Sequence, residues 1–158
     1  MKILIVADTL LTGGAEWFLL RQYKYLLDSG HTLHLFVTRP DHVDKRMLEN
    51  FPSVQYISSP SALVRFTAYA DRVIQKLFKR DFLLNTLNKF YIRFALAKLR
   101  PDVIHSHLFQ ADYKVFLANR KNPVRHIITV HGDYIELIKK NKTIYFSPYY
   151  ISTHGCLC

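Results

Sequence analysis

Residues 2–21 read KILIVADTLLTGGAEWFLLR, and this stretch decides the fold. Its opening apolar run, Ile3 to Ala7, is typical of a strand that is buried on both faces. A short loop then leads to Gly13 and Gly14, after which apolar residues recur at helical spacing. We therefore predict a buried strand followed by a helix over residues 14–28.

Gly13 and Gly14 lie at the turn from this strand into this helix. A phosphate placed there would meet the free N–H groups and the positive dipole end of the helix. The same pair also fits a tight connection that binds nothing. Its spacing matches neither the dinucleotide fingerprint nor the P-loop. Taken by itself, the turn leaves both interpretations open.

The alternation of strand and helix continues along the chain. We predict further strands over residues 32–38, 54–57, 103–107 and 127–132, and helices over residues 41–49 (capped by Asp41), 62–99 (broken near residues 79–81) and 109–118. This order predicts an α/β fold, with a Rossmann-like, doubly wound, mostly parallel sheet and flanking helices. A chain of 158 residues that is 49% hydrophobic suits a single domain over residues 1–158.

The chain is strongly basic, with 22 Lys and Arg against 12 Asp and Glu and a formal net charge of +10. Such an excess favours nucleic acid, acidic lipid surfaces or phosphorylated small molecules as partners, although a solvated basic surface needs none of them. Zinc-finger spacing, an RNP-like aromatic motif and a basic tail are all missing from the sequence. We therefore expect no nucleic-acid partner.

The termini indicate a cytoplasmic protein. The two cysteines, Cys156 and Cys158, are too few for a disulfide scaffold or a zinc site and are interpreted as reduced thiols. The apolar run at the N-terminus is too short for a signal peptide. No run of about 18 apolar residues occurs that would cross a bilayer.

The segment over residues 62–99 combines apolar stripes with basic charge. One stripe consists of Leu63, Phe66, Ala70, Val73 and Leu77, and the other of Leu83, Leu87, Phe90, Phe94 and Ala97. Eight Lys and Arg residues accompany only two Asp residues. We expect most of the apolar surface to pack on the sheet, with the charges solvated. The alternative is that a basic amphipathic face lies on an anionic bilayer.

Two predicted strands end in histidines, as the Gly13–Gly14 turn follows the end of another strand. In parallel sheets, ligands bind beyond the carboxyl ends of the strands. His107 and His131 each end a predicted strand, as the glycine turn follows a third. One such histidine is more commonly structural, but the three features together predict a site at this edge. The turn would stabilise a leaving diphosphate, and the imidazoles would bond a sugar hydroxyl or a phosphate.

The sequence predicts neither a metal site nor a nucleophilic triad. We expect His105 and His107 to point to opposite faces of one strand, which argues against a shared metal ion. The G-x-S-x-G elbow is missing from the sequence, and both cysteines are terminal. Glu16 is unusual beside a bound anion, and we expect it to complement the helix dipole or to bond a neighbouring hydroxyl.

Four segments carry a resemblance to a known family. They are KILIVADTLLTGGAEWFLL (2–20), DSGHTLHLFVT (28–38), RPDVIHSHLFQADYKVFLA (100–118) and HIITVHGDY (126–134). In this order they resemble the N-terminal half of a family 4 glycosyltransferase with the GT-B fold, with residues 41–99 as a variable middle. GGAE, PDVIHSH and TVHG at these spacings are fairly specific in combination.

The resemblance implies a function and a site. It implies retaining transfer of a sugar from a nucleotide-sugar donor to a surface-glycan or lipid-linked acceptor, with neither a metal nor another cofactor required. The N-terminal domain would mainly hold the acceptor. Gly13 and Gly14 would face the donor diphosphate, and His107 and His131 would act beside the transferred sugar. Such enzymes often work at the cytoplasmic face of the cell membrane, which implies a peripheral location.

The chain departs from the family pattern in one large respect. The C-terminal nucleotide-sugar-binding domain, with its E-x7-E motif, is absent from the sequence. We therefore expect an incomplete acceptor-side domain with little or no activity alone. Two alternatives remain, namely half of a sugar-nucleotide epimerase and a basic membrane-surface module without catalysis.

Overall fold

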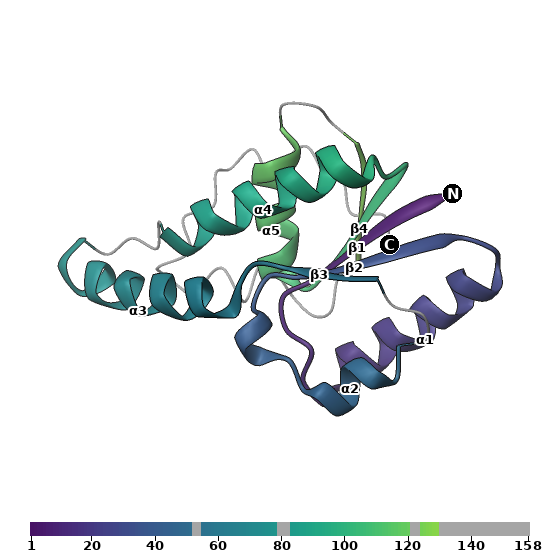
Figure 1. Cartoon of the computed structure of the whole chain (residues 1–158), viewed down its shortest axis with the longest axis horizontal. Helices are drawn as coiled ribbons and strands as arrows, with labels where there is room; N and C mark the ends of the chain where they lie inside the picture. Colours follow the sequence, from purple (N-terminus) through teal and green to yellow (C-terminus); the bar gives the residue numbers. More distant parts are fainter. Residues whose placement is uncertain (52–54, 79–82, 121–123, 130–158) are drawn as a thin grey trace.

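The computed structural model describes residues 1–51, 55–78, 83–120 and 124–129, and Figure 1 shows their arrangement. The strands are β1 (Lys2–Ala7), β2 (Thr32–Val37), β3 (Gln55–Ser58), β4 (Val103–His107) and β5 (Arg125–Thr129). The helices are α1 (Gly14–Asp28), the 3-10 turn η1 (Pro40–His42), α2 (Lys45–Glu49), α3 (Ser61–Phe78), α4 (Leu83–Leu99) and α5 (Phe109–Asn119). The predicted helix over residues 14–28 is confirmed at both ends.

The five strands form one parallel sheet in the order β3-β2-β1-β4-β5. Ala7, the last residue of β1, pairs with Val37 of β2 on one side and with His107 of β4 on the other. The carboxyl ends of the three central strands are therefore level. The order reverses direction at β1, which is where open α/β sheets place their ligands. The predicted Rossmann-like, doubly wound sheet is confirmed.

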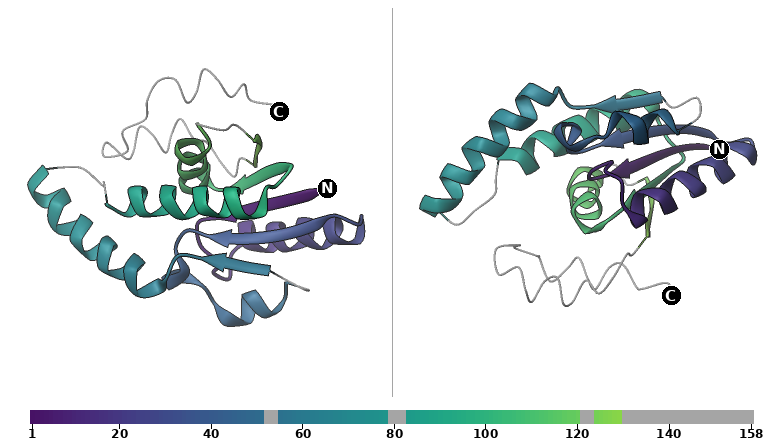
Figure 2. Two further views of the ribbon diagram at one scale, coloured as in Figure 1. Left: turned by 45° about the horizontal axis from the view of Figure 1, so that its top comes forward. Right: turned by 90° about the horizontal axis from the view of Figure 1, so that it is seen from below.

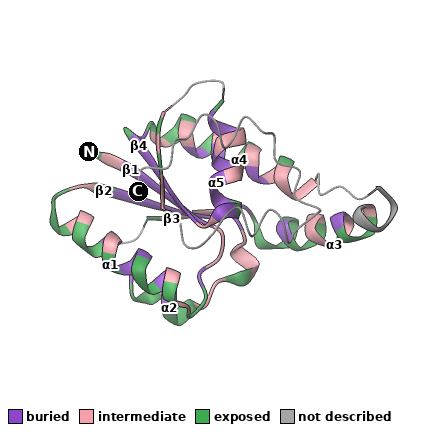
Figure 3. Ribbon diagram, turned by 180° about the vertical axis from the view of Figure 1, so that it is seen from behind, coloured by how far each residue is buried: buried purple, intermediate pink, exposed green. Residues whose placement is uncertain are grey.

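Helices cover both faces of the sheet, so two separate cores form. On one face, Ile3, Ile5 and Leu35 pack with buried residues of α1 and α2. On the other, Leu4 and Val6 pack with buried residues of α4 and α5. Figure 2 shows the sheet between these two layers of helices, and Figure 3 shows the buried residues gathered on the strands and on α5. This sandwiching explains why the central strands are apolar on both faces.

The predicted cap at Asp41 is wrong. Asp41 lies in η1 and pairs with Arg39, whereas Asp44 caps α2 by accepting a hydrogen bond from the backbone N–H of Arg46. The predicted segment thus divides into a 3-10 turn and a shorter helix. Both aspartates suit a helix start, but the carboxylate of Asp41 is bound by Arg39, two residues before it, and by His42.

The predicted packing of the first apolar stripe on the sheet is also wrong. Three of its residues, Leu63, Phe66 and Val73, are exposed, with Phe66 at 69%. Helix α3 packs against α4 and η1, and Figure 1 shows it extending beyond the edge of the sheet. The described buried side chains of α3 are Val64 and Asp71. The amphipathic pattern predicted the helix correctly but did not show what its apolar face contacts.

The stripe expected on α4 is on the wrong side of that helix. Phe90 and Phe94 are exposed, whereas Asn88, Ile92 and Ala95 face the core. Helix α4 carries apolar residues on more than one side, so its sequence offered two candidate faces. The polar residue Asn88 lies on the buried face, which a count of apolar residues would not select.

Several expectations fall outside the described residues. They include the end of the last predicted strand with His131, and the cysteines Cys156 and Cys158. Among the described helices, none has the length and apolar character needed to cross a membrane.

Candidate active-site edge of the sheet

Gly13 and Gly14 begin α1 as predicted. Gly13 is the N-cap, with an extended backbone at φ −136° that any residue adopts, and its carbonyl accepts the first helical hydrogen bond from Trp17 N–H at 3.0 Å. A Cβ on Gly13 would lie only 2.6 Å from Glu16 Oε2. A larger residue here would require the flexible end of the Glu16 side chain to shift, so the group that approaches Gly13 in this structure is a side chain of the same helix.

Glu16 covers the start of its own helix. Its side chain is nearly buried, and Oε1 accepts a hydrogen bond from Thr9 Oγ1 at 3.3 Å. A carboxylate in the first helical turn is also favoured by the helix dipole. The expected bond to a neighbouring hydroxyl is confirmed. An incoming phosphate would therefore meet a negative charge at this turn.

His107 is the last residue of β4 and is buried. Its ring centroid lies 6.5 Å from that of Phe18, one turn into α1. The structure therefore brings the helix that begins at Gly14 and the strand that ends at His107 to the same edge of the sheet. The second predicted histidine, His131, lies outside the described residues.

The expectation that His105 and His107 face opposite ways is wrong. Their ring centroids are 4.4 Å apart, because residues two apart in a strand share one face. His105 Nε2 also lies 2.7 Å from Thr129 Oγ1 on β5. In the described part of the chain, no group of three or more His, Cys, Asp or Glu is arranged to hold a metal ion.

The structure does bring a serine, an aspartate and a histidine together. Ser106 Oγ lies 2.5 Å from Asp112 Oδ1 and 2.6 Å from His126 Nε2. The serine has one proton, which it donates to the carboxylate, so Nε2–H of His126 must donate to the serine. The histidine is then no base for the serine, and Ser106 is fully buried. This cluster ties β4 to α5 and β5 and is no nucleophilic triad.

Sequence reasoning missed the ion pair that joins Asp8 to Lys114. Asp8 directly follows β1, and its Oδ1 lies 2.6 Å from Lys114 Nζ of α5. Lys114 Nζ also donates to Thr38 Oγ1 at 2.9 Å, and Thr38 in turn donates to Asp8 Oδ1. Burial would raise the pKa of Asp8, but the charge of Lys114 and these hydrogen bonds, together with Arg39, lower it. A lysine among the buried alanines of α5 was the signal available in the sequence.

A second ion pair follows β2. Arg39 Nε and Nη2 donate to the two carboxylate oxygens of Asp41, each at 3.0 Å. His42 Nδ1 lies 3.0 Å from the same carboxylate. Burial would raise the pKa of Asp41, but the Arg39 hydrogen bond and the charges of Arg39 and His42 lower it. The guanidinium of Arg39 is therefore held in a fixed orientation at the carboxyl edge.

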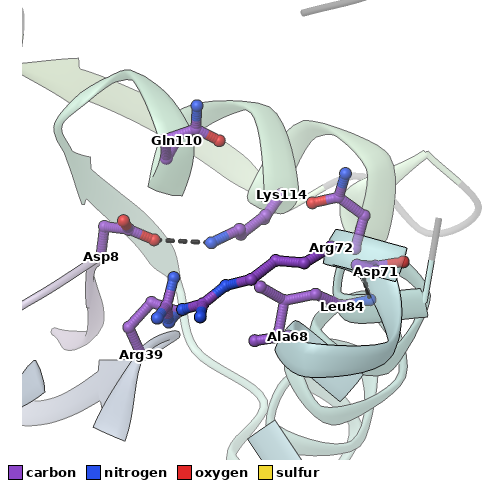
Figure 4. A pocket seen from close by; sticks show the side chains of 9 residues that line it. Asp8, Arg39, Ala68, Asp71, Arg72, Leu84, Gln110 and Lys114 are labelled. Atoms are coloured by element: carbon purple, nitrogen blue, oxygen red, sulfur yellow. Dashed lines mark hydrogen bonds and ion pairs between the residues drawn. The ribbon is translucent and has the colours of Figure 1, made fainter. Parts of the chain in front are cut away.

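These two ion pairs border a pocket of about 350 Å³, shown in Figure 4. Its remaining lining residues come from three helices: Ala68, Asp71 and Arg72 of α3, Leu84 and Asn85 of α4, and Gln110 of α5. The pocket is therefore built between the sheet edge and the helices on one face.

Comparison with known proteins places the chain in a family. The model of Glycosyltransferase Family 4 matches residues 12–156. The chain belongs to Glycosyltransferase Family 4. No curated protein sequence matches it.

Two solved structures resemble this family 4 chain in fold. The apo form of lipopolysaccharide outer core galactosyltransferase WaaB has a TM-score of 0.59 and 19% identity, over 81% of this chain and 32% of that one. A glycosyltransferase from Rickettsia africae ESF-5 has a TM-score of 0.58 and 17% identity, over 91% of this chain and 34% of that one. The chain thus spans about a third of the length of each, and the likeness shows the shared fold.

Proposed function

We propose that this family 4 chain is the acceptor-side domain of a retaining glycosyltransferase. It would take a sugar from a nucleotide-sugar donor and pass it to a surface-glycan or lipid-linked acceptor. The observation that carries the proposal is the shared carboxyl edge of Gly13, Gly14 and His107, in a chain matched by the family model over residues 12–156. WaaB is a lipopolysaccharide outer core galactosyltransferase, so a cell-surface glycan is the first acceptor class to test.

In this proposal each feature of the edge has a chemical role. The N–H groups at Gly13 and Gly14 stabilise the charge of the departing diphosphate, in the manner of an anion hole. His107 and His131 hydrogen-bond the transferred sugar or the acceptor hydroxyl. Glu16 moves away from Gly13 when the diphosphate arrives, because two negative charges at one helix start repel each other. The reaction is proposed to need neither a metal nor another cofactor.

The transfer experiment joins this chain to the part of WaaB that lies outside the structural match, because we propose that residues 1–158 alone do not complete the cleft. The fusion is incubated with nucleotide sugars and a truncated glycan acceptor, and the product is analysed by mass spectrometry. We expect transfer by the fusion, none by the chain alone, and a product anomer that retains the donor configuration. Isomerised donor without a glycosylated product would instead indicate an epimerase.

Matched variants locate the site within that fusion. His107→Ala should lower the rate by about a hundredfold or more if the imidazole acts on the reacting groups. His34→Gln replaces another buried histidine, within β2, and should leave the rate close to that of the parent. Circular dichroism checks that both variants fold. Equal rates for the two variants would remove His107 from the site.

A second proposed property is binding to an anionic membrane surface. The exposed apolar residues of α3, including Phe66 and Tyr69, lie on one side of the helix, and the exposed cation Arg65 lies beside them. Apolar contact and attraction to acidic lipid then act together. This charge complementarity favours an anionic bilayer as the partner, which would make the protein peripheral at the inner face of the cell membrane.

Liposome flotation tests this second property. The chain should float with phosphatidylglycerol vesicles and remain unbound with phosphatidylcholine vesicles. Phe66→Ser with Tyr69→Ser should abolish flotation, whereas Tyr25→Ser, at an aromatic residue that is 71% exposed on α1, should not. Equal flotation with both lipids, or an equal effect of the two sets of substitutions, would argue against the membrane surface.

A further inference from the structure

The pocket beside the sheet edge is distinct from the Gly13–Gly14 turn. Neither glycine lines it, and neither does His107. Its volume of about 350 Å³ lies in the range of small-molecule sites, which is about 300–1,000 Å³. The pocket is therefore large enough for a ligand group of its own.

Three cationic side chains enter this pocket from three different elements. Arg39 follows β2, Arg72 belongs to α3 and Lys114 belongs to α5. The charge of Lys114 is matched by Asp8, and that of Arg39 by Asp41. Arg72 makes no ion pair with any described residue. Figure 4 shows its side chain reaching across the pocket, so that its guanidinium points toward the side of Asp8 and Arg39.

The two lining carboxylates are already supplied with donors. Asp71 accepts hydrogen bonds from the backbone N–H groups of Leu83 and Leu84, at 2.9 and 2.7 Å, and so holds the start of α4. Asp8 is held by Lys114. The lining contains three cations, Arg39, Arg72 and Lys114, and only these two carboxylates, so it carries one excess positive charge. Two guanidinium groups that enter one cavity repel each other unless an anion lies between them.

The arrangement of donors favours a phosphate over a carboxylate. N–H groups are offered by Arg39 and Arg72 on different walls, and an amide is offered by Gln110 on a further helix. A planar carboxylate accepts within one plane, whereas a tetrahedral phosphate accepts from several directions. Arginine is also the side chain best suited to hold phosphate oxygens in pairs.

Asp8 adds a second kind of contact. Both of its side-chain hydrogen bonds, from Lys114 and Thr38, go to Oδ1. Its other oxygen, Oδ2, accepts no hydrogen bond from a described residue. The lowered pKa of Asp8 keeps it ionised, so it only accepts hydrogen bonds. A hydroxyl is the neutral donor that a sugar would bring to this oxygen.

We propose that this pocket binds a phosphorylated sugar, with its phosphate on Arg72 and Arg39 and one hydroxyl on Asp8 Oδ2. The inference rests on the proposed function in taking this sugar phosphate as part of the acceptor. The phosphate would then anchor the acceptor beside the edge where transfer occurs, so a phosphorylated acceptor would be preferred to a neutral one.

Calorimetry on the 158-residue chain tests the pocket without any transfer reaction. The probes are glucose 6-phosphate, inorganic phosphate and glucose at one ionic strength. We expect saturable one-to-one binding of both phosphates, tighter for glucose 6-phosphate, and no heat with glucose. Arg72→Gln should weaken phosphate binding about tenfold or more, since a charged hydrogen-bonding partner is lost.

Arg21→Gln is the matched control, because it removes the same charge from an exposed position of α1 outside the pocket. It should leave the affinity within about twofold, as expected for a distant surface charge. An equal loss for the two variants would show general attraction to a basic protein and overturn the proposal. Failure of the parent chain to bind either phosphate would also overturn it.

Vesicles distinguish the two sources of such a phosphate. If the anchor is a lipid phosphate, glucose 6-phosphate will compete with phosphatidylglycerol vesicles, and Arg72→Gln will weaken vesicle binding. If the phosphate belongs to a soluble glycan, neither glucose 6-phosphate nor Arg72→Gln will change vesicle binding. These readouts involve no donor, so failure of sugar transfer in the fusion would not affect them.

Discussion

Lys114 Nζ lies 2.6 Å from Asp8 Oδ1, although the two residues are 106 positions apart in the sequence. The lysine belongs to α5 and is almost completely buried, whereas the aspartate directly follows the central strand β1. This contact fixes α5 to the carboxyl edge of the sheet, with Thr38 as the third partner. It therefore determines one wall of the candidate site.

Lys114→Met should destabilise the protein strongly, because it leaves the Asp8 carboxylate without its cation. We expect a loss of roughly 2–4 kcal/mol in the free energy of unfolding, measured by urea denaturation. The double variant Asp8→Asn with Lys114→Met should lose less free energy of unfolding than Lys114→Met, because no uncompensated charge remains. A double variant as unstable as the sum of the two single variants would contradict this coupling.

The same pair predicts a loss of stability in acid. The pKa of Asp8 is lowered in the folded state, so its stabilising contribution is fully present above the ordinary value of 3.8. That contribution is lost as the pH falls through the folded-state pKa. The stability difference between the parent and the double variant should therefore shrink below pH 3.8.

His34 predicts a second loss of stability in acid, which begins at a higher pH than that of Asp8. Burial first, and then the charge of Lys2, lower the pKa of His34 below 6.5. The unfolded chain then binds the proton more tightly, so stability falls as the pH drops below 6.5. Thermal unfolding of His34→Gln should lose part of this pH dependence between pH 7.5 and 5, compared with the parent. An unchanged profile would mean that His34 does not titrate differently on folding.

Ser106→Ala tests the structural interpretation of the buried serine. The substitution removes the proton that Ser106 donates to the buried Asp112, at a cost of about 1–3 kcal/mol. In the fused transferase, the rate per folded molecule should stay the same, because the serine hydroxyl is no nucleophile here. A rate that falls while stability is kept would contradict this interpretation.

Two glycine substitutions should differ for a reason visible in the backbone. Gly30 has φ +80°, so Gly30→Ala should cost about 1 kcal/mol of stability. Gly13→Ala meets only the flexible end of Glu16 and should cost less than about 0.5 kcal/mol. Chemical denaturation of the two variants side by side measures the difference. A larger cost at Gly13 would mean that Glu16 cannot move aside.

The sequence predicted the elements well where the pattern depends on the local chain. The apolar run of β1 and the helix over residues 14–28 are confirmed because strand burial and helix caps leave local signals. The prediction of Asp41 as a cap failed because its carboxylate pairs with Arg39, whereas Asp44 caps α2. The predicted packing of the apolar stripes of α3 and α4 was wrong, because an apolar face does not identify the surface that it contacts.

What the sequence determined by itself was the parallel sheet, its family and the edge at which Gly13, Gly14 and His107 meet, since these follow from periodicity, strand ends and motifs. The tertiary structure alone decided that Asp8, Thr38 and Lys114 form one network and that Arg72 points into the pocket beside it. Their positions depend on strand order and on the packing of α3 and α5. Such contacts join residues far apart in the chain, and no local pattern encodes them.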